Sequence, residues 1–202
     1  LGEFRYGLIN KVVKSIDRKE GMVNRYLNLI NKRYHHRLRP SITSITNEEF
    51  LNDRFALKKN YVVFCPDAEF GPAKKWPTSY FADVASKYLS NGWQVILLGS
   101  KNDKKDAEDI KHEINSNNEN LVDLTGETSL LDAIDVLSFL DLVLTNDSGL
   151  MHVAAAVNTP LVALYGPTSP EFTPPLTEKA ITIRKTSGYS NVRRGNTDKG
   201  YH

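Results

Sequence analysis

From Tyr61 onward, short apolar runs alternate with longer stretches whose apolar residues recur at helical spacing. The apolar runs are continuous, which is typical of parallel strands that are covered on both faces. Pro77-Thr78 and Asn91-Gly92 are typical start and stop signals for a helix between two such runs. The predicted strands cover 61–65, 93–99, 121–124, 141–146, 160–165 and 180–184, and the predicted helices cover 78–91, 103–117, 129–139 and 147–156. This alternation predicts an α/β fold, a Rossmann-like parallel sheet with helices on both faces.

The first 47 residues do not follow this pattern. Apolar residues at helical spacing predict an amphipathic helix over about 21–33, whereas Pro40 and the surrounding serines and threonines predict a linker over 35–47. The tail 185–202 is basic and polar, which predicts a loop. We therefore divide the chain into a leading segment, 1–47, and an α/β domain, 48–202.

Composition excludes several classes of protein. The 202 residues carry a formal net charge of +2, which gives no general reason to expect nucleic-acid binding. The single cysteine, Cys65, excludes an internal disulfide and, at the end of an apolar strand, is expected to be a buried structural thiol. No apolar run reaches membrane-spanning length, and no signal peptide is evident. Because the chain starts at Leu1 rather than at methionine, we expect it to be part of a longer protein.

The segment TNDSGLMHVAAA (145–156) is the most informative candidate site. A predicted strand runs directly into a predicted helix through Asp147, Ser148 and Gly149. The first amides of a helix have no partner within it, and the positive end of the helix dipole lies there, so the turn favours a phosphate. Gly149 leaves room for a ligand to approach. The alternative is that Asp147 or Ser148 simply caps the helix, which stabilises it by about 1 kcal/mol.

Other strand ends carry further candidates, because ligands of parallel sheets bind at the carboxyl ends of the strands. Lys74, beside Lys75, is placed to reach a pyrophosphate, or it is a solvated loop lysine. Asp103 suits ribose hydroxyls, or it is an acid at the start of the next helix. His152 is either a half-buried, satisfied histidine or a ligand contact.

Several common sites are absent from the sequence. It has no GxGxxG after a strand, no GxxxxGK[ST] and no G-x-S-x-G, so a dinucleotide site, a P-loop and a nucleophile elbow are not expected. No cluster of cysteine and histidine predicts zinc. We therefore expect no metal site and no required cofactor, and leave any assistance by Mg²⁺ open.

Three strings are specific when taken together: CPDAEFGPAKKWP (65–77), TNDSGLMHVAAA (145–156) and LVALYGPTSPEFTPPL (161–176). They resemble the bacterial ADP-heptose:lipopolysaccharide heptosyltransferases, and LTGETSLLDA (124–133) and the tail 188–202 extend the likeness. The resemblance implies the two-domain GT-B fold. In that fold 1–47 is the remnant of the amino-terminal domain with its linker, and 48–202 is the donor-binding domain, truncated at its carboxyl end.

The resemblance also implies roles for particular residues. Lys74 contacts donor phosphate or sugar, Asp103 holds the ribose, and Asp147 bonds heptose hydroxyls. The amides of Ser148 and Gly149 receive the pyrophosphate. The remaining donor-site residues are Thr125 and Gly126, near the nucleoside, and His152.

The implied reaction is an inverting transfer of heptose from ADP-heptose to the heptosyl-Kdo-lipid A inner core of lipopolysaccharide. The implied location is cytoplasmic, with peripheral contact at the inner membrane, and the oligomeric state is left open. The general base belongs to the part of the family that this chain does not match, so we expect no catalytic residue here, although Lys74 can act electrostatically. Asp67 stands where the family usually has glycine, which is expected to weaken donor binding. A non-catalytic remnant and another GT-B enzyme, such as a nucleotide-sugar epimerase, remain alternatives.

Overall fold

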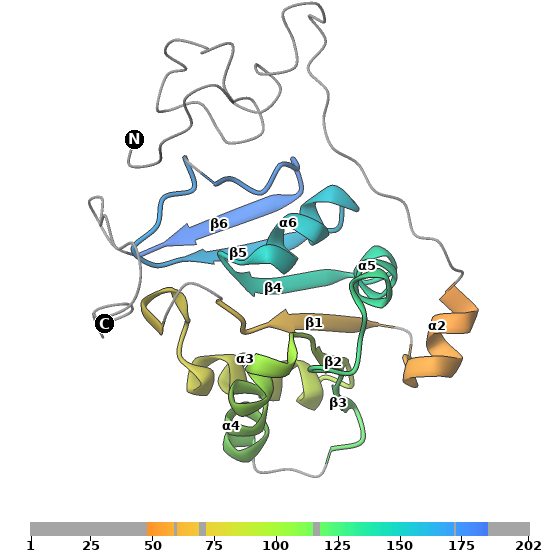
Figure 1. The fold of residues 1–202 in the computed structure, drawn as a ribbon. Coiled ribbons are helices and arrows are strands. Elements are labelled where there is room, and N and C mark those ends of the chain that lie inside the picture. The colour runs from red at the N-terminus through yellow and green to blue at the C-terminus, as the bar shows by residue number, and fades with distance from the viewer. Residues whose placement is uncertain (1–47, 59, 69–71, 115–117, 172, 186–202) are drawn as a thin grey trace, which may run out of the picture.

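The sheet is the centre of the computed structural model, which describes residues 48–58, 60–68, 72–114, 118–171 and 173–185. Its strands are β1 (Tyr61–Cys65), β2 (Gln94–Leu97), β3 (Leu121–Asp123), β4 (Leu142–Asn146), β5 (Leu161–Tyr165) and β6 (Ala180–Arg184). All neighbouring strands pair in parallel, in the order β3-β2-β1-β4-β5-β6 (Figure 1). The predicted strands and the predicted α/β sheet are therefore confirmed.

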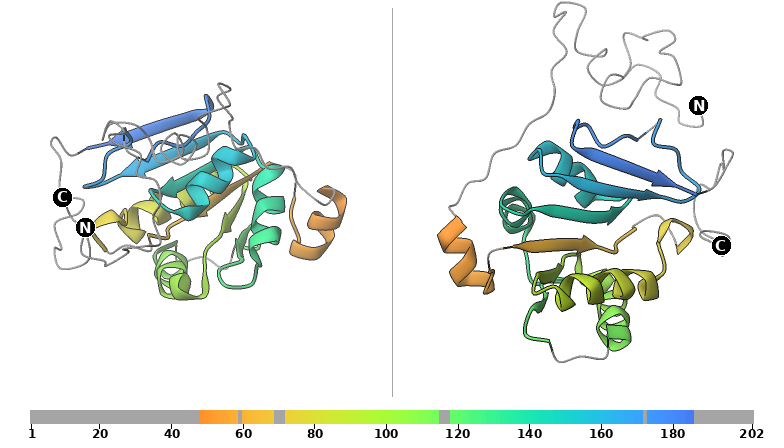
Figure 2. Two further views of the ribbon diagram at one scale, coloured as in Figure 1. Left: turned by 45° about the horizontal axis from the view of Figure 1, so that its top comes forward. Right: turned by 180° about the vertical axis from the view of Figure 1, so that it is seen from behind.

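Helices cover both faces of this sheet (Figure 2). The described helices are α2 (Glu48–Phe55), α3 (Thr78–Ser90), α4 (Lys104–Ile114), α5 (Leu130–Ser138) and α6 (Gly149–Ala156), with short 3-10 turns η1 (Pro72–Lys74) and η2 (Lys101–Asp103). The predicted helices between the strands are confirmed. The predicted helix 21–33, the linker 35–47 and all of the tail but residue 185 lie outside the described residues.

Strand geometry explains how the core is divided. Successive side chains of a strand point to opposite faces, so β1 sends Val62 and Phe64 toward α3 and α4, and Val63 and Cys65 toward α5 and α6. Each face thus has its own buried apolar cluster. Cys65 is fully buried, as predicted, and burial raises the pKa of its thiol far above the ordinary value, with Asp67 and Asp103 adding to the shift. The thiol stays protonated and unreactive.

The topology determines where a ligand site is expected. From β1 the chain moves outward to β2 and β3, and then it returns to β4 on the other side of β1 and continues to β5 and β6. The neighbours β1 and β4 therefore form the topological switch point, where parallel α/β sheets bind ligands beyond the carboxyl ends of the strands. The arrowheads in Figure 1 mark this edge of the sheet, and the connections after β1 and β4 lie there.

Candidate functional site

An ion pair spans the switch point. The Lys74 ammonium, at the end of η1, lies 2.7 Å from Oδ2 of Asp147, which follows β4. Both side chains are largely buried, with 17% and 5% of their surfaces exposed. The interpretation of Lys74 as a solvated loop lysine is therefore wrong: the fold brings it directly to the turn that the sequence singles out.

The start of α6 lacks a side-chain cap. Ser148 occupies the N-cap position with extended backbone angles, φ −139 and ψ 178, but its side chain makes no capping hydrogen bond. The Asp147 carboxylate faces Lys74 and Thr173 instead of the helix amides. A Cβ added to Gly149 would meet nothing within 4 Å. The simple capping interpretation of Asp147 and Ser148 is wrong, and no described residue fills the space in front of Gly149.

Three buried hydroxyls at the same edge lack a hydrogen-bond partner among the described residues. They belong to Thr125 after β3, Ser148 after β4 and Thr168 after β5. An unsatisfied buried hydroxyl costs about 1–3 kcal/mol, and in native proteins such groups are usually satisfied by water or by a bound molecule. The carboxyl ends of the strands thus hold hydrogen-bonding groups that the described residues leave unsatisfied.

The connection after β5 completes the surroundings of Asp147 with residues that the sequence analysis does not single out. The Thr173 hydroxyl donates to Oδ1 of Asp147 at 3.4 Å. The Tyr165 hydroxyl donates to the Thr173 carbonyl at 2.7 Å and lies 3.3 Å from the sulfur of Met151. Burial, helped by the charge of Asp147, raises the pKa of Tyr165 well above its ordinary value of 10.0, so its hydroxyl remains a donor. No local motif marks Tyr165 or Thr173, because their partners come from other elements.

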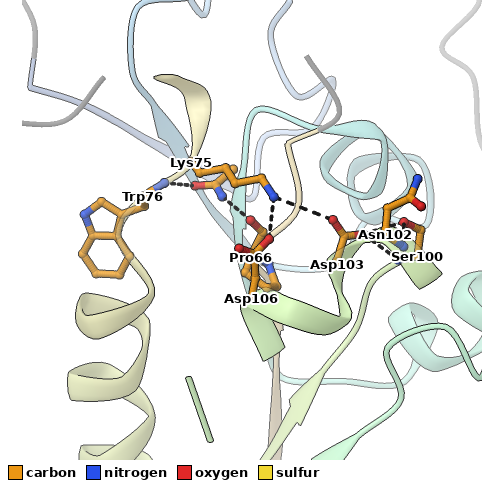
Figure 3. A network of polar contacts seen from close by, with 8 residues as sticks. Pro66, Lys75, Trp76, Ser100, Asn102, Asp103 and Asp106 are labelled. Carbon is orange, nitrogen blue, oxygen red and sulfur yellow. Dashed lines mark hydrogen bonds and ion pairs between the residues drawn. The ribbon is translucent and has the colours of Figure 1, made fainter. Parts of the chain in front are cut away.

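Lys75 serves a different purpose from its neighbour Lys74. Its ammonium bonds to Asp106 in α4 and lies 3.9 Å from Oδ1 of Asp103, so it ties the connection after β1 to the one after β2 (Figure 3). Asp103 is buried, and its Oδ2 accepts from the backbone N–H of Ser100 at 2.8 Å and from the Ser100 hydroxyl at 2.6 Å. The helix-start interpretation of Asp103 is confirmed by this capping box. Its ribose role stays a prediction, which only Oδ1 is placed to fulfil.

Thr125 and Gly126 lie after β3, beside this capping box. Gly126 has a φ of +76, and its N–H donates to the Gly99 carbonyl at 2.9 Å. A Cβ at Gly126 would lie 3.0 Å from carbons of the Lys101 and Lys104 side chains. Glycine is therefore required here both for the backbone conformation and for the close packing, and the nucleoside contact stays a prediction.

His152 lies one turn into α6, with part of its side chain exposed and part covered by protein, so the expectation of a half-buried histidine holds and a ligand contact stays a prediction. Desolvation by surrounding protein atoms lowers the pKa of His152 below its ordinary value of 6.5. The negative charge of Asp147 opposes this shift, and the positive charge of Lys74 adds to it. The three side chains thus share one electrostatic environment at the start of α6.

Comparison with known proteins shows the family of the chain. The family model of glycosyltransferase family 9 (heptosyltransferase) matches residues 1–202. The chain belongs to this family. Members of family 9 that resemble it include lipopolysaccharide heptosyltransferase 2 of Escherichia coli, 41% identical over the whole of this chain and 62% of the relative, and that of Salmonella typhimurium, 42% identical with the same coverage. This family 9 chain thus spans less than two thirds of the length of these relatives.

A solved structure confirms the fold of this family 9 chain. The structure of ADP-heptose lps heptosyltransferase II from E. coli matches with a TM-score of 0.82 and 40% identity, over 93% of this chain and 61% of that one. A family 9 glycosyl transferase from Veillonella parvula, at 24% identity and a TM-score of 0.70, shares the fold.

Within the described residues, no helix is both long and apolar enough to cross a membrane. No group of three or more histidine, cysteine, aspartate or glutamate side chains in this part of the chain is arranged to hold a metal ion. The site described above consists of a lysine, a carboxylate, hydroxyls and backbone amides.

Proposed function

We propose that this chain holds the diphosphate of ADP-heptose against the start of α6, as the donor-binding part of a lipopolysaccharide heptosyltransferase. The observation that carries the proposal is the uncapped start of α6, which lies at the switch point with Lys74 beside it. Amides at a helix start and a lysine ammonium are the groups that proteins use to bind phosphates. The names of the family and of the E. coli and Salmonella relatives support heptose as the transferred sugar and favour a transferase over an epimerase.

The same groups suit the chemistry of the transfer. When the bond between sugar and diphosphate breaks, the leaving ADP gains negative charge. The α6 amides and Lys74 then stabilise the transition state more than the bound donor, which is the condition for catalysis. Asp147 pairs with Lys74, and we assign it to accept hydrogen bonds from the sugar hydroxyls. We place the general base outside this chain.

The acceptor and the location follow from the same proposal. The acceptor is the anionic heptosyl-Kdo-lipid A inner core, a glycolipid, so the whole enzyme would work in the cytoplasm in peripheral contact with the inner membrane. The relatives named lipopolysaccharide heptosyltransferase 2 support this assignment.

Calorimetric titration with ADP tests the donor site. We expect binding that Lys74→Ala weakens by roughly tenfold or more, because a charge-assisted hydrogen bond contributes about 1.5–3 kcal/mol. Lys58→Ala is the matched control, because Lys58 precedes β1, at the opposite edge of the sheet, and bonds to Asn120. Absence of ADP binding at roughly millimolar ADP would overturn the proposal. A dissociation constant of about 1 mM corresponds to a binding free energy of about 4 kcal/mol.

A turnover assay separates a donor-binding part from a complete enzyme. Because the general base is placed outside this chain, we expect the 202 residues to form no product from ADP-heptose and acceptor. Detectable transfer by this chain would contradict that placement, without affecting the donor site.

A further inference from the structure

Asn146, the last residue of β4, makes two hydrogen bonds that reach the connection after β1. Its side chain is fully buried. The amide nitrogen Nδ2 donates to the carbonyl of Pro66 at 2.8 Å, and Oδ1 accepts from the backbone N–H of Trp76 at 3.1 Å. Pro66 directly follows β1, and Trp76 directly precedes Pro77, the N-cap of α3. Asn146 therefore joins the end of β1 to the start of α3 across the switch point, where Figure 3 shows Pro66 and Trp76.

This bridge lies next to both lysines of the site. Lys74 and Lys75 directly precede Trp76 in the chain, so the backbone position of Trp76 determines where their side chains begin. On the opposite side, Asn146 directly precedes Asp147, the partner of Lys74. Two consecutive residues at the end of β4 thus hold the segment 74–76: Asn146 bonds to the Trp76 backbone, and Asp147 pairs with the Lys74 ammonium.

We propose that Asn146 is a positioning residue: it keeps Lys74 in place to meet a diphosphate at the start of α6. This role rests on the proposed function, because it acts through the contact of Lys74 with the diphosphate. Asn146 itself does not contact the ligand. Asparagine suits the position because its side chain donates at one atom and accepts at the other. An ionised aspartate cannot donate to the Pro66 carbonyl, and alanine leaves both buried backbone groups without their partner.

The first experiment compares two buried hydrogen bonds at opposite edges of the sheet. Asn146→Ala removes the bridge. Thr159 lies just before β5, and Thr159→Val removes the hydrogen bond from its hydroxyl to the Leu137 carbonyl. We expect both variants to unfold at lower temperature than the wild type. Only Asn146→Ala should raise the ADP dissociation constant, by about tenfold, which corresponds to about 1.4 kcal/mol. Hydrogen exchange of the Trp76 amide should accelerate in that variant alone.

A second variant keeps the test decisive if Asn146→Ala does not fold. In Asn146→Asp the protonated carboxylic acid can donate to Pro66 and accept from Trp76, whereas the ionised form cannot donate. Relative to the wild type at the same pH, this variant should bind ADP more tightly at about pH 5 than at about pH 8, because burial raises the pKa of a carboxyl. A purely structural role would leave the ADP affinity of the folded variant unchanged between these conditions.

The outcomes separate the two proposals. If the wild type binds ADP, two results would overturn the role of Asn146 alone. One is an unchanged ADP affinity in folded Asn146→Ala. The other is a ratio of Asn146→Asp to wild-type ADP affinity that does not change with pH. No ADP binding by the wild type would overturn the donor site itself, and this role with it. Weaker ADP binding by Asn146→Ala, with Thr159→Val unchanged, supports both.

Discussion

Helices α5 and α6 both begin after a strand at the same edge of the sheet, and both have serine at the N-cap. In α5 the Ser129 hydroxyl accepts from the Asp132 N–H at 3.2 Å, while Asp132 accepts from the Ser129 N–H at 2.8 Å. The turn η2, which leads into α4, has the same reciprocal pattern between Ser100 and Asp103. In α6 the buried Ser148 hydroxyl has no partner among the described residues, and Met151 stands where the acid would be.

This difference shows which helix start has backbone amides that can still bind an anion. A capping box satisfies two backbone donors and brings a carboxylate to the helix start, which excludes an anion. The helix starts after β2 and β3 are closed in this way by their own side chains. At the start of α6 the amides are left for a ligand, and the nearby carboxylate, Asp147, is turned to Lys74. Among the described helix starts that follow β2, β3 and β4, only that of α6 combines uncapped amides with a neighbouring cation.

Giving α6 an acidic N-cap should remove this difference. In Ser148→Asp the carboxylate would accept from the first amides of α6 and place a negative charge where the diphosphate is expected. We predict at least about a hundredfold loss of ADP affinity, which corresponds to about 2.7 kcal/mol, by calorimetry. Ser129→Asp in α5 is the matched control and should leave ADP binding unchanged. Retention of wild-type affinity in Ser148→Asp would place the diphosphate elsewhere.

Removing the charge of Asp147 should act in the opposite direction. In Asp147→Asn, Lys74 is released from its partner and the repulsion between the carboxylate and a diphosphate is lost. We predict an increase in ADP affinity of about fivefold, or about 1 kcal/mol. Asp83→Asn is the control, because Asp83 is exposed on α3. Weaker ADP binding in Asp147→Asn would mean that the carboxylate supports the diphosphate subsite through the position of Lys74.

Local patterns account for most of the fold and for the centre of the site. Continuous apolar runs and clear helix signals determine β1 to β6 and α3 to α6, because each depends on neighbours in the sequence. The turn at Asp147 to Gly149 is predictable for the same reason. The contacts of the side chains around it are not: Asn146 and Thr173 bond to residues distant in sequence, and Tyr165 bonds across the connection that follows β5.

The two consecutive lysines illustrate this limit. Sequence places Lys74 and Lys75 at one strand end, with nothing local to separate their roles. The sheet order then puts β4 on one side of β1 and β2 on the other. Lys74 meets Asp147 after β4, and Lys75 meets Asp103 and Asp106 after β2. The distinction between a site lysine and a structural one therefore arises only when the sheet forms.

The titration of His152 should report the charges at the start of α6. Desolvation holds its pKa below 6.5, Asp147 opposes the shift and Lys74 adds to it. We predict by NMR that Asp147→Asn lowers this pKa further, whereas Lys74→Ala raises it. ADP should raise it as well, because a bound anion favours the charged imidazole. An unchanged pKa in both variants would mean that His152 does not sense the ion pair.

The smallest effect is expected at the closed helix start of α5. Burial raises the pKa of Asp132, but hydrogen bonds from Ser129 and Arg54 outweigh it, so the pKa lies below the ordinary value of 3.8. Stability from this carboxylate is thus present above the unfolded-state pKa and is lost as pH falls through the folded one. We predict that Asp132→Ala lowers stability by about 1 kcal/mol at neutral pH, measured by denaturant unfolding, and by less below about pH 4. ADP binding should not change, because the acid that closes α5 lies outside the diphosphate site. A pH-independent loss would mean that packing, not the ionised carboxylate, determines its contribution.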